Sequence, residues 1–276
     1  MLSTMNFTVL RREFNKVDIS KGTAIVIGNF DGVHKGHQSL ISQGVKRAEE
    51  QGLTTVLYTF EPHPKKLFLG EKAPKPITPF AAKARILKKL GIELLVARPF
   101  TKDFAATHFS DFVDHLKHDL HVKAIVVGED FAFGKGREGS AVKLKKLGDL
   151  QGFETVVVKD VICDETARFS STRIRTLLAD GQLKQANLLL GRVFSAYSFL
   201  HEDSHCNLVA HFSHYTPVKN GVYLAKIQYT DPSMQVDSCV VPLKVEDNTG
   251  YIPPLPNLPN LLEGKIKLSL IDKIEE

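Results

Sequence analysis

The feature that most constrains this chain is the regular alternation of apolar runs and amphipathic segments between residues 23 and 190. Each apolar run has the β-branched content of a strand, and each is followed by a segment with helical spacing. Strands that are apolar throughout need cover on both faces, which crossover helices supply in a parallel sheet. The sequence therefore predicts an α/β fold with a doubly wound parallel sheet.

The expected elements follow from these runs and from the residues that end or cap helices. The expected strands are 23–30, 53–60, 92–100, 122–130 and 153–161. The expected helices are 36–52, 80–91, 111–120, 142–150, 171–180 and 182–190, with Ser110 as the cap of the third. Ligands of such sheets bind outside the carboxyl ends of the strands, so the loops after the first, second and fourth strands are the expected binding segments.

The pattern changes after residue 191. Stretches of period two at 221–229, 237–245 and 265–274 indicate antiparallel strands. We therefore expect an α/β domain over residues 1–190 and a small all-β domain over residues 191–276.

Composition limits the kinds of binding partner and the cellular compartment that we expect. The 36 Lys and Arg against 31 Asp and Glu give a mild excess of +5, which suits small anions better than a nucleic-acid track. The three cysteines are far apart and form no CxxC, so a reducing compartment is expected. The chain starts without a signal-peptide pattern and contains no run of 18 apolar residues. We expect a cytoplasmic protein that binds neither nucleic acid nor membrane; the sequence leaves its oligomeric state open.

The segment GNFDGVHKGHQSL, residues 28–40, carries the clearest chemical signal. A strand ends here, glycines permit a tight backbone path, and a helix begins, so that backbone N–H groups and the helix dipole form an anion site. His34 in the loop and His37 in the first turn add two imidazoles that donate hydrogen bonds to phosphate and accept protons. This arrangement favours phosphoryl or nucleotidyl transfer.

Other interpretations of the same segments carry less weight. A zinc site would need further His or Cys ligands at familiar spacing, so no protein-bound metal is predicted. Dinucleotide binding would need GxGxxG, whereas these glycines are four residues apart. The segment GKGREGS, residues 134–140, lacks the GK[ST] ending of a P-loop. A structural loop with incidental histidines stays open.

Four segments together resemble a known family. GNFDGVHKGHQ, TFEPHP (59–64), GEDFAFGKGREG (128–139) and RFSSTRIRTLL (168–178) are similar to the signature segments of the FMN adenylyltransferase module of prokaryotic FAD synthetases, in the same order and spacing. The resemblance implies a Rossmann-like nucleotidyltransferase that moves AMP from ATP to FMN, with Mg²⁺ bound alongside ATP.

The resemblance also assigns roles to individual residues. The implied catalytic residues are His34, His37, Arg168 and Ser171. The residues implied in ATP binding are Gly28, Asn29, Phe30, Asp31, Gly36, Thr172 and Arg175. Those implied in flavin binding are Glu61, His63, Pro64, Asp130, Phe131 and Phe133.

Each role has a simpler alternative. A residue within Ser170–Thr172 could cap a helix, the two arginines could be solvated surface charges, and His63 could be an ordinary loop residue. Core packing accounts for Phe131 and Phe133 as well as flavin stacking does. Asp130 stands where relatives often have asparagine.

In bifunctional members of this family the C-terminal domain is a β-barrel riboflavin kinase with a glycine-rich flap, a Pro-Thr-x-Asn motif and a glutamate base. Pro217 and the strand at 221–223 fit that framework, so we expect an antiparallel β-barrel. The flap glycines and any PTxN are missing, and the surroundings of Glu246 do not match. We therefore expect a degenerate kinase domain, in a chain that makes FAD from FMN but no FMN from riboflavin. Three alternatives stay open: a bifunctional enzyme, transfer to another phosphorylated acceptor, and a flavin-binding sensor without turnover.

Overall fold

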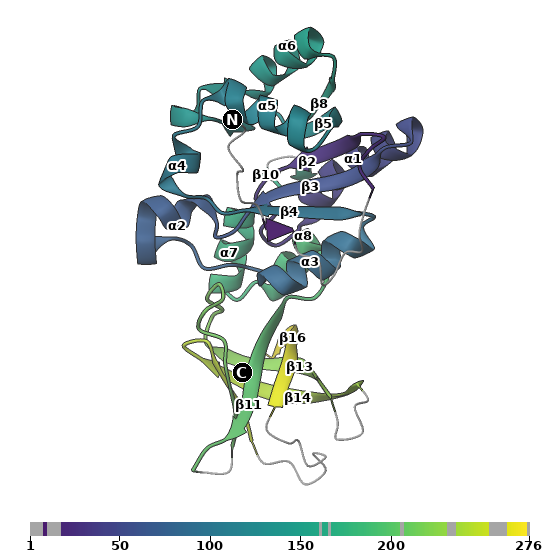
Figure 1. Ribbon diagram of the computed structural model, residues 1–276. Helices are drawn as coiled ribbons and strands as arrows, with labels where there is room; N and C mark the ends of the chain where they lie inside the picture. The colour runs from purple at the N-terminus through teal and green to yellow at the C-terminus, as the bar shows by residue number, and fades with distance from the viewer. Residues whose placement is uncertain are drawn as a thin grey trace. The chain divides into compact units, whose positions relative to one another are not determined.

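The computed structural model describes residues 8–9, 18–159, 162–164, 167–204, 207–230, 236–253 and 264–274 (Figure 1). The chain divides into two compact units. The first unit contains Met1–Pro74 and Phe80–Arg168, and the second contains Lys75–Pro79 and Phe169–Glu276. No helix of the described ranges has both the length and the apolar character needed to cross a lipid bilayer.

The first unit is built on a six-stranded sheet in the order β1-β4-β3-β2-β5-β8. Five of the strands are parallel, and the short β1 pairs with β4 in the antiparallel direction. The strands are β1 (Thr8–Val9), β2 (Thr23–Ile27), β3 (Thr54–Phe60), β4 (Leu94–Arg98), β5 (Val122–Gly128) and β8 (Glu154–Val158). The predicted parallel sheet is confirmed.

The strand order creates a switch point beside β2. The chain runs from β2 outward through β3 to β4, and then returns to the other side of β2 to form β5 and β8. Ligands of doubly wound sheets bind at the crevice where this reversal occurs, outside the carboxyl ends of the strands. The loops that follow β2 and β5 at this edge are the GNFDGVHKGH and GEDFAFG segments.

Helices cover both faces of the sheet (Figure 1). On one face α5 (Phe109–Asp119) and α6 (Ala141–Gln151) pack over Ile25 and Ile27. On the other face α1 (Lys35–Gln51) and α3 (Phe80–Lys89) pack over Val26. Every residue of β2 is buried, and neighbouring residues of a strand point to opposite faces, so β2 is covered on both sides.

Short elements connect these layers. They are α2 (Pro64–Leu69), η1 (Gly70–Lys72), α4 (Lys102–Ala105), the hairpin β6 (Ala132–Phe133) and β7 (Gly139–Ser140) around η2 (Lys135–Arg137), and the pair β9 (Ile162–Asp164) and β10 (Ala167–Arg168).

Gly44 marks the closest approach of α1 to the sheet. A Cβ at this position would lie well inside van der Waals contact with Val26 Cγ2. Alanine gains about 1 kcal/mol of helix propensity over glycine, whereas overpacking a core costs about 1–3 kcal/mol, and here we expect the clash to win. Gly44→Ala should lower the free energy of unfolding in urea. Ser42→Ala on the exposed side of α1 is the matched control and should leave it near the wild-type value; a more stable Gly44→Ala would contradict this packing.

Besides the segment Lys75–Pro79, the second unit contains the helices α7 (Ser171–Ala179) and α8 (Leu183–Leu190). Gly191, near the predicted domain boundary, ends α8 with a φ of 68°. A closed antiparallel barrel follows, in the order β11-β12-β15-β14-β13-β16. Its strands are β11 (Ser195–Glu202), β12 (Leu208–His211), β13 (Gly221–Thr230), β14 (Val236–Glu246), β15 (Thr249–Ile252) and β16 (Gly264–Ile274). The predicted barrel is confirmed; β11, β12 and β15 had no counterpart among the expected strands.

Candidate active site

His34 and His37 form a stacked pair at the start of α1. His34 is the N-cap residue, and its Nδ1 accepts a hydrogen bond from the backbone N–H of His37 at 3.3 Å. The two rings stack with centroids 3.6 Å apart and planes 17° apart. The rings of Phe30 and His37 meet edge to face with centroids 5.2 Å apart. The two imidazoles predicted from sequence are thus brought together beside the helix N-terminus.

The capping bond fixes the chemistry of the His34 ring. Because Nδ1 accepts the N–H of His37, the proton of the neutral ring lies on Nε2, which is then a donor. The ring is buried, with 4% of His34 exposed. A buried donor beside the N–H groups of a first helical turn favours an oxyanion, and phosphate above all.

The loop before α1 is held in an uncommon backbone conformation. Phe30 and Val33 have φ values of 52° and 39°, a region that side chains rarely adopt. Both side chains are fully buried in the core between α1, α3 and the sheet. Packing therefore imposes this conformation and fixes the direction in which the histidine pair points, as is common at functional sites.

The second predicted loop, after β3, lies against the first. The hydroxyl of buried Thr59 donates to the carbonyl of Asn29 at 3.1 Å, which ties the two loops together. His63 caps α2, since its Nδ1 accepts from the backbone N–H of Lys65 at 3.1 Å, and Pro64 is the first residue of that helix. Glu61, Pro62 and His63 connect β3 to α2, a short helix that is not among the elements expected from the sequence.

A buried lysine that sequence reasoning missed joins these loops. Lys83 of α3 places Nζ 3.4 Å from the carbonyl oxygen of Asn29 and 3.8 Å from Glu61 Oε2. Burial lowers the pKa of Lys83, while the nearby Glu61 and Asp31 carboxylates oppose that shift. Burial likewise raises the pKa of Glu61, with Lys83 lowering it and Asp31 raising it further. Lys83, Glu61 and Asp31 form one electrostatic group beneath the histidine loop.

An aromatic cluster, also missed, lies at the carboxyl ends of β3 and β4. Phe100 contacts the rings of Phe60, Phe104 and Phe68 at centroid distances of 5.4, 5.6 and 6.1 Å. Phe68 is 68% exposed, so the cluster presents apolar ring surface to solvent. Four phenylalanines from α2, α4 and two strand ends are dispersed in the sequence, which is why spacing alone could not group them.

The loop after β5 carries the remaining predicted flavin residues. Asp130 is exposed in a turn closed by the bond from Phe131 N–H to the Gly128 carbonyl at 3.1 Å. Phe131 and Phe133 stack with centroids 5.2 Å apart. Phe133 is buried in the core against Phe112, and Phe131 is partly buried there. Core packing is thus observed for Phe133, and the flavin contacts of Asp130, Phe131 and Phe133 stay predictions.

The fourth motif falls on both units. Arg168 is exposed on β10 in the first unit, whereas α7 belongs to the second. The N-cap of α7 is Ser170, whose Oγ accepts from the N–H of Arg173 at 3.1 Å, so Ser171 is not the cap. Arg175 donates from Nε to the backbone carbonyl of Lys75 at 3.2 Å. That Arg168, Ser171, Thr172 and Arg175 join the histidine pair stays a prediction.

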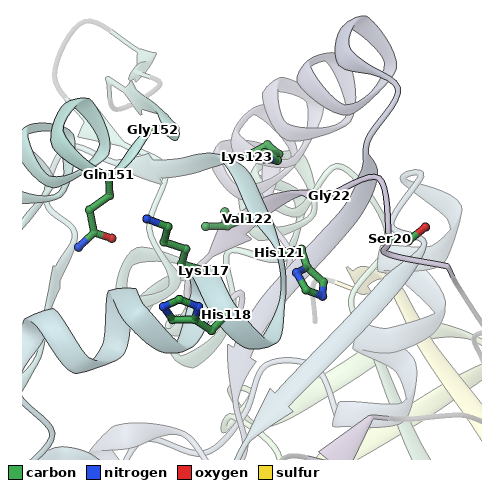
Figure 2. A pocket seen from close by; sticks show the side chains of 9 residues that line it. All are labelled: Ser20, Gly22, Lys117, His118, His121, Val122, Lys123, Gln151 and Gly152. Atoms are coloured by element: carbon green, nitrogen blue, oxygen red, sulfur yellow. The ribbon is translucent and has the colours of Figure 1, made fainter.

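A pocket of about 280 Å³ lies at the amino ends of the parallel strands, opposite the end that carries the histidine pair. Its lining includes Gly22 and Val122, at the amino ends of β2 and β5, whereas the histidine pair follows the carboxyl end of β2. Figure 2 shows Lys117 and His118 from α5 and His121 from the turn before β5 around it. This pocket is therefore separate from the predicted site.

Within the described ranges, no group of three or more His, Cys, Asp or Glu side chains is arranged to hold a metal ion. In the second unit the rings of His201 and His211 have centroids 5.4 Å apart.

Known proteins resemble this chain in sequence and in structure. Residues 16–173 match the family model described as FAD synthetase. The bifunctional riboflavin kinase/FMN adenylyltransferase of Buchnera aphidicola subsp. Acyrthosiphon pisum is 34% identical over 232 residues, which cover 80% of this chain and 73% of that protein. The protein of the same name from Escherichia coli (strain K12) is 38% identical over 177 residues, covering 63% of this chain and 56% of that protein.

A solved structure resembles this chain over a longer stretch. A crystal structure described as a macrolide-efflux protein from Streptococcus pneumoniae superposes with a TM-score of 0.80 at 26% identity, covering 92% of this chain and 86% of that one. The resemblance inferred from the four motifs is thus confirmed by independent matches. The chain belongs to the FAD synthetase family, with an FMN adenylyltransferase domain and a C-terminal β-barrel domain.

Proposed function

We propose that this protein acts in the cytoplasm and, through residues 1–190, transfers AMP from ATP to FMN to give FAD and pyrophosphate. The observation that carries the proposal is the stacked pair of His34 and His37 at the N-terminus of α1, beside the switch point of the sheet. Imidazole and backbone N–H donors converge there on the place where a phosphate chain is best stabilised.

The reaction needs no nucleophilic side chain. The FMN phosphate is ionised at neutral pH, and one of its oxygens attacks the α-phosphorus of ATP in line. The new O–P bond forms as the bond from the α-phosphorus to its bridging oxygen breaks, and pyrophosphate leaves with that oxygen. The chain contributes positioning and stabilisation of the charge that builds up on the phosphate oxygens.

The donor set also indicates how magnesium takes part. Imidazole N–H and backbone N–H groups suit phosphate oxygens, whereas Mg²⁺ prefers oxygen ligands and keeps several waters. In this proposal ATP therefore enters as its magnesium complex, and the histidine pair binds the phosphates. The α7 hydroxyls of Ser171 and Thr172, with Arg168 and Arg175, add contacts to the triphosphate, since guanidinium groups match phosphate geometry.

The flavin is proposed to lie between the loops after β3 and β5. Glu61, His63 and Pro64 border one side and Asp130 with Phe131 the other. The exposed ring surface of the phenylalanine cluster around Phe100 supports an apolar, aromatic ligand at this edge.

The barrel, residues 191–276, is proposed to have lost riboflavin kinase activity. Residues 192–220 contain no glycine, so the backbone there cannot closely approach a phosphate. Glu246 ends β14 with its carboxylate 2.7 Å from Lys244 Nζ, and both side chains are exposed. The barrel is nevertheless closed and well packed, which supports a retained role in stability, assembly or regulation.

One assay tests both parts. Purified protein with ATP, magnesium and FMN is expected to form FAD, and with riboflavin in place of FMN it is expected to form no FMN, as resolved by chromatography. FMN formed from riboflavin would establish the bifunctional alternative, which the names of the relatives favour. Bound FMN without turnover would indicate a sensor. Competition between FMN and other phosphorylated acceptors tests the choice of acceptor.

A further inference from the structure

Lys83 is buried where a lysine has no structural need to be. It is 5% exposed, the only buried lysine of the described ranges, whereas Lys88 and Lys89 at the end of the same helix are exposed. Lysine is almost never fully buried unless it is paired, because its ammonium group loses hydration. A methionine of similar length would fill the same space without that cost, so stability alone does not explain this lysine.

The Lys83 ammonium reaches loops from two adjacent strands. It donates to the carbonyl of Asn29, which leads into the histidine loop, at 3.4 Å, and lies 3.8 Å from the carboxylate of Glu61 in the flavin loop. The ring of Phe80, one turn earlier on α3, lies 5.1 Å from Nζ. Lys83 thus spans the two segments that have to stay in register for ATP and FMN to meet.

The charges around Glu61 explain why the lysine matters. Burial raises the pKa of Glu61, the Lys83 ammonium lowers it, and the Asp31 carboxylate raises it further. Without Lys83 only the two raising influences remain, so the Glu61 carboxyl would hold its proton to higher pH. The glutamate is 44% exposed at its side chain, so protonation rather than unfolding is the expected response.

We propose that Lys83 is a positioning residue for adenylyl transfer, which locks the histidine loop to the flavin loop and keeps Glu61 ionised for FMN binding. The inference rests on the proposed function, since it takes FMN as the ligand of the Glu61 loop. In this proposal Lys83 acts through Asn29 and Glu61 and not through a contact of its own with substrate.

Lys83→Met is the direct test. We expect kcat/KM for FMN to fall about 10- to 100-fold, as for a small misplacement of reacting groups, with KM for ATP little changed. FMN binding, followed by quenching of flavin fluorescence, should weaken in parallel. The proposal takes ionised Glu61 as the form that binds FMN, so activity is expected to fall as pH falls through its pKa; a raised pKa moves this acid limb to higher pH. The midpoint of thermal unfolding should stay equal or rise.

Two further variants separate this role from a structural one. Lys88→Met, on the exposed side of the same helix, should change none of these quantities. Glu61→Gln should remove the acid limb, and the double variant Lys83→Met/Glu61→Gln should show no further change in pH dependence.

Each outcome decides something different. An unchanged acid limb and unchanged FMN binding in Lys83→Met overturn the proposal, and so does a loss of activity that only follows a lowered unfolding midpoint. If the wild-type protein binds FMN but forms no FAD, the proposed function fails, and the binding titration still decides the role of Lys83. If the wild-type protein does not bind FMN, both fail.

Discussion

His37→Ala is expected to lower kcat for FAD formation by about 100- to 1,000-fold, the usual cost of removing one donor from a transition-state oxyanion site. His37 stacks on His34 at 3.6 Å and is half-buried, so its ring keeps one orientation. The charge on the phosphate oxygens grows as pyrophosphate leaves, and this is the moment at which a fixed imidazole donor stabilises most. Rates are measured from FAD resolved by chromatography at saturating ATP and FMN.

His34 combines this role with a structural one, and the variants can separate them. His34→Ala removes a donor and also the N-cap of α1, which costs about 1 kcal/mol of stability. Asparagine is among the best N-cap residues, so His34→Asn should restore the unfolding midpoint and leave turnover about as low as in His34→Ala. Turnover near the wild-type rate in His37→Ala or His34→Asn would remove the histidine pair from the mechanism.

The sheet and the histidine motif were predictable because both depend on local sequence. Five apolar runs of strand length can be buried only in a sheet that helices cover on both faces, and the histidine motif lies directly after the first run. The helix caps were harder to predict from the sequence. His34, His63 and His108 each accept a backbone N–H through Nδ1, although histidine is not among the favoured N-cap residues. The prediction that Ser110 caps α5 was wrong for this reason: His108 is the cap, and its Nδ1 accepts from the Ser110 N–H at 3.4 Å.

What the sequence could not supply depends on contacts between distant segments. Lys83 lies in FAAKARILKK, where any of the basic residues fits a solvated helix face, and its burial follows only from where the loops after β2 and β3 lie. The cluster around Phe100 joins residues from four separate segments. The strand order that sets the switch point also arises from pairing between distant runs. Local periodicity predicts where strands are but not which strands pair.

In the second unit, Asn248→Ala is expected to give the largest loss of stability, about 2–5 kcal/mol. Asn248 is 5% exposed in the turn between β14 and β15, with a φ of 59° that costs alanine about 1–2 kcal/mol. Its Oδ1 accepts from the N–H of Val218 at 2.9 Å, and its Nδ2 donates to the Tyr215 carbonyl at 3.3 Å. Leaving such buried groups without partners costs about 1–3 kcal/mol more, which gives the expected total.

The neighbouring residue supplies a matched control. Asp247 has a φ of 47° in the same turn but is exposed, so Asp247→Ala carries the backbone cost without loss of buried hydrogen bonds. Asn248→Gly loses the buried hydrogen bonds but carries no backbone cost, since glycine adopts positive φ freely. The chain has no tryptophan, and five of its six tyrosines lie in the barrel, so tyrosine fluorescence during urea unfolding reports mainly on this unit. If Asn248→Ala is no less stable than Asp247→Ala, the buried hydrogen bonds contribute nothing and the strain of the turn accounts for the whole effect.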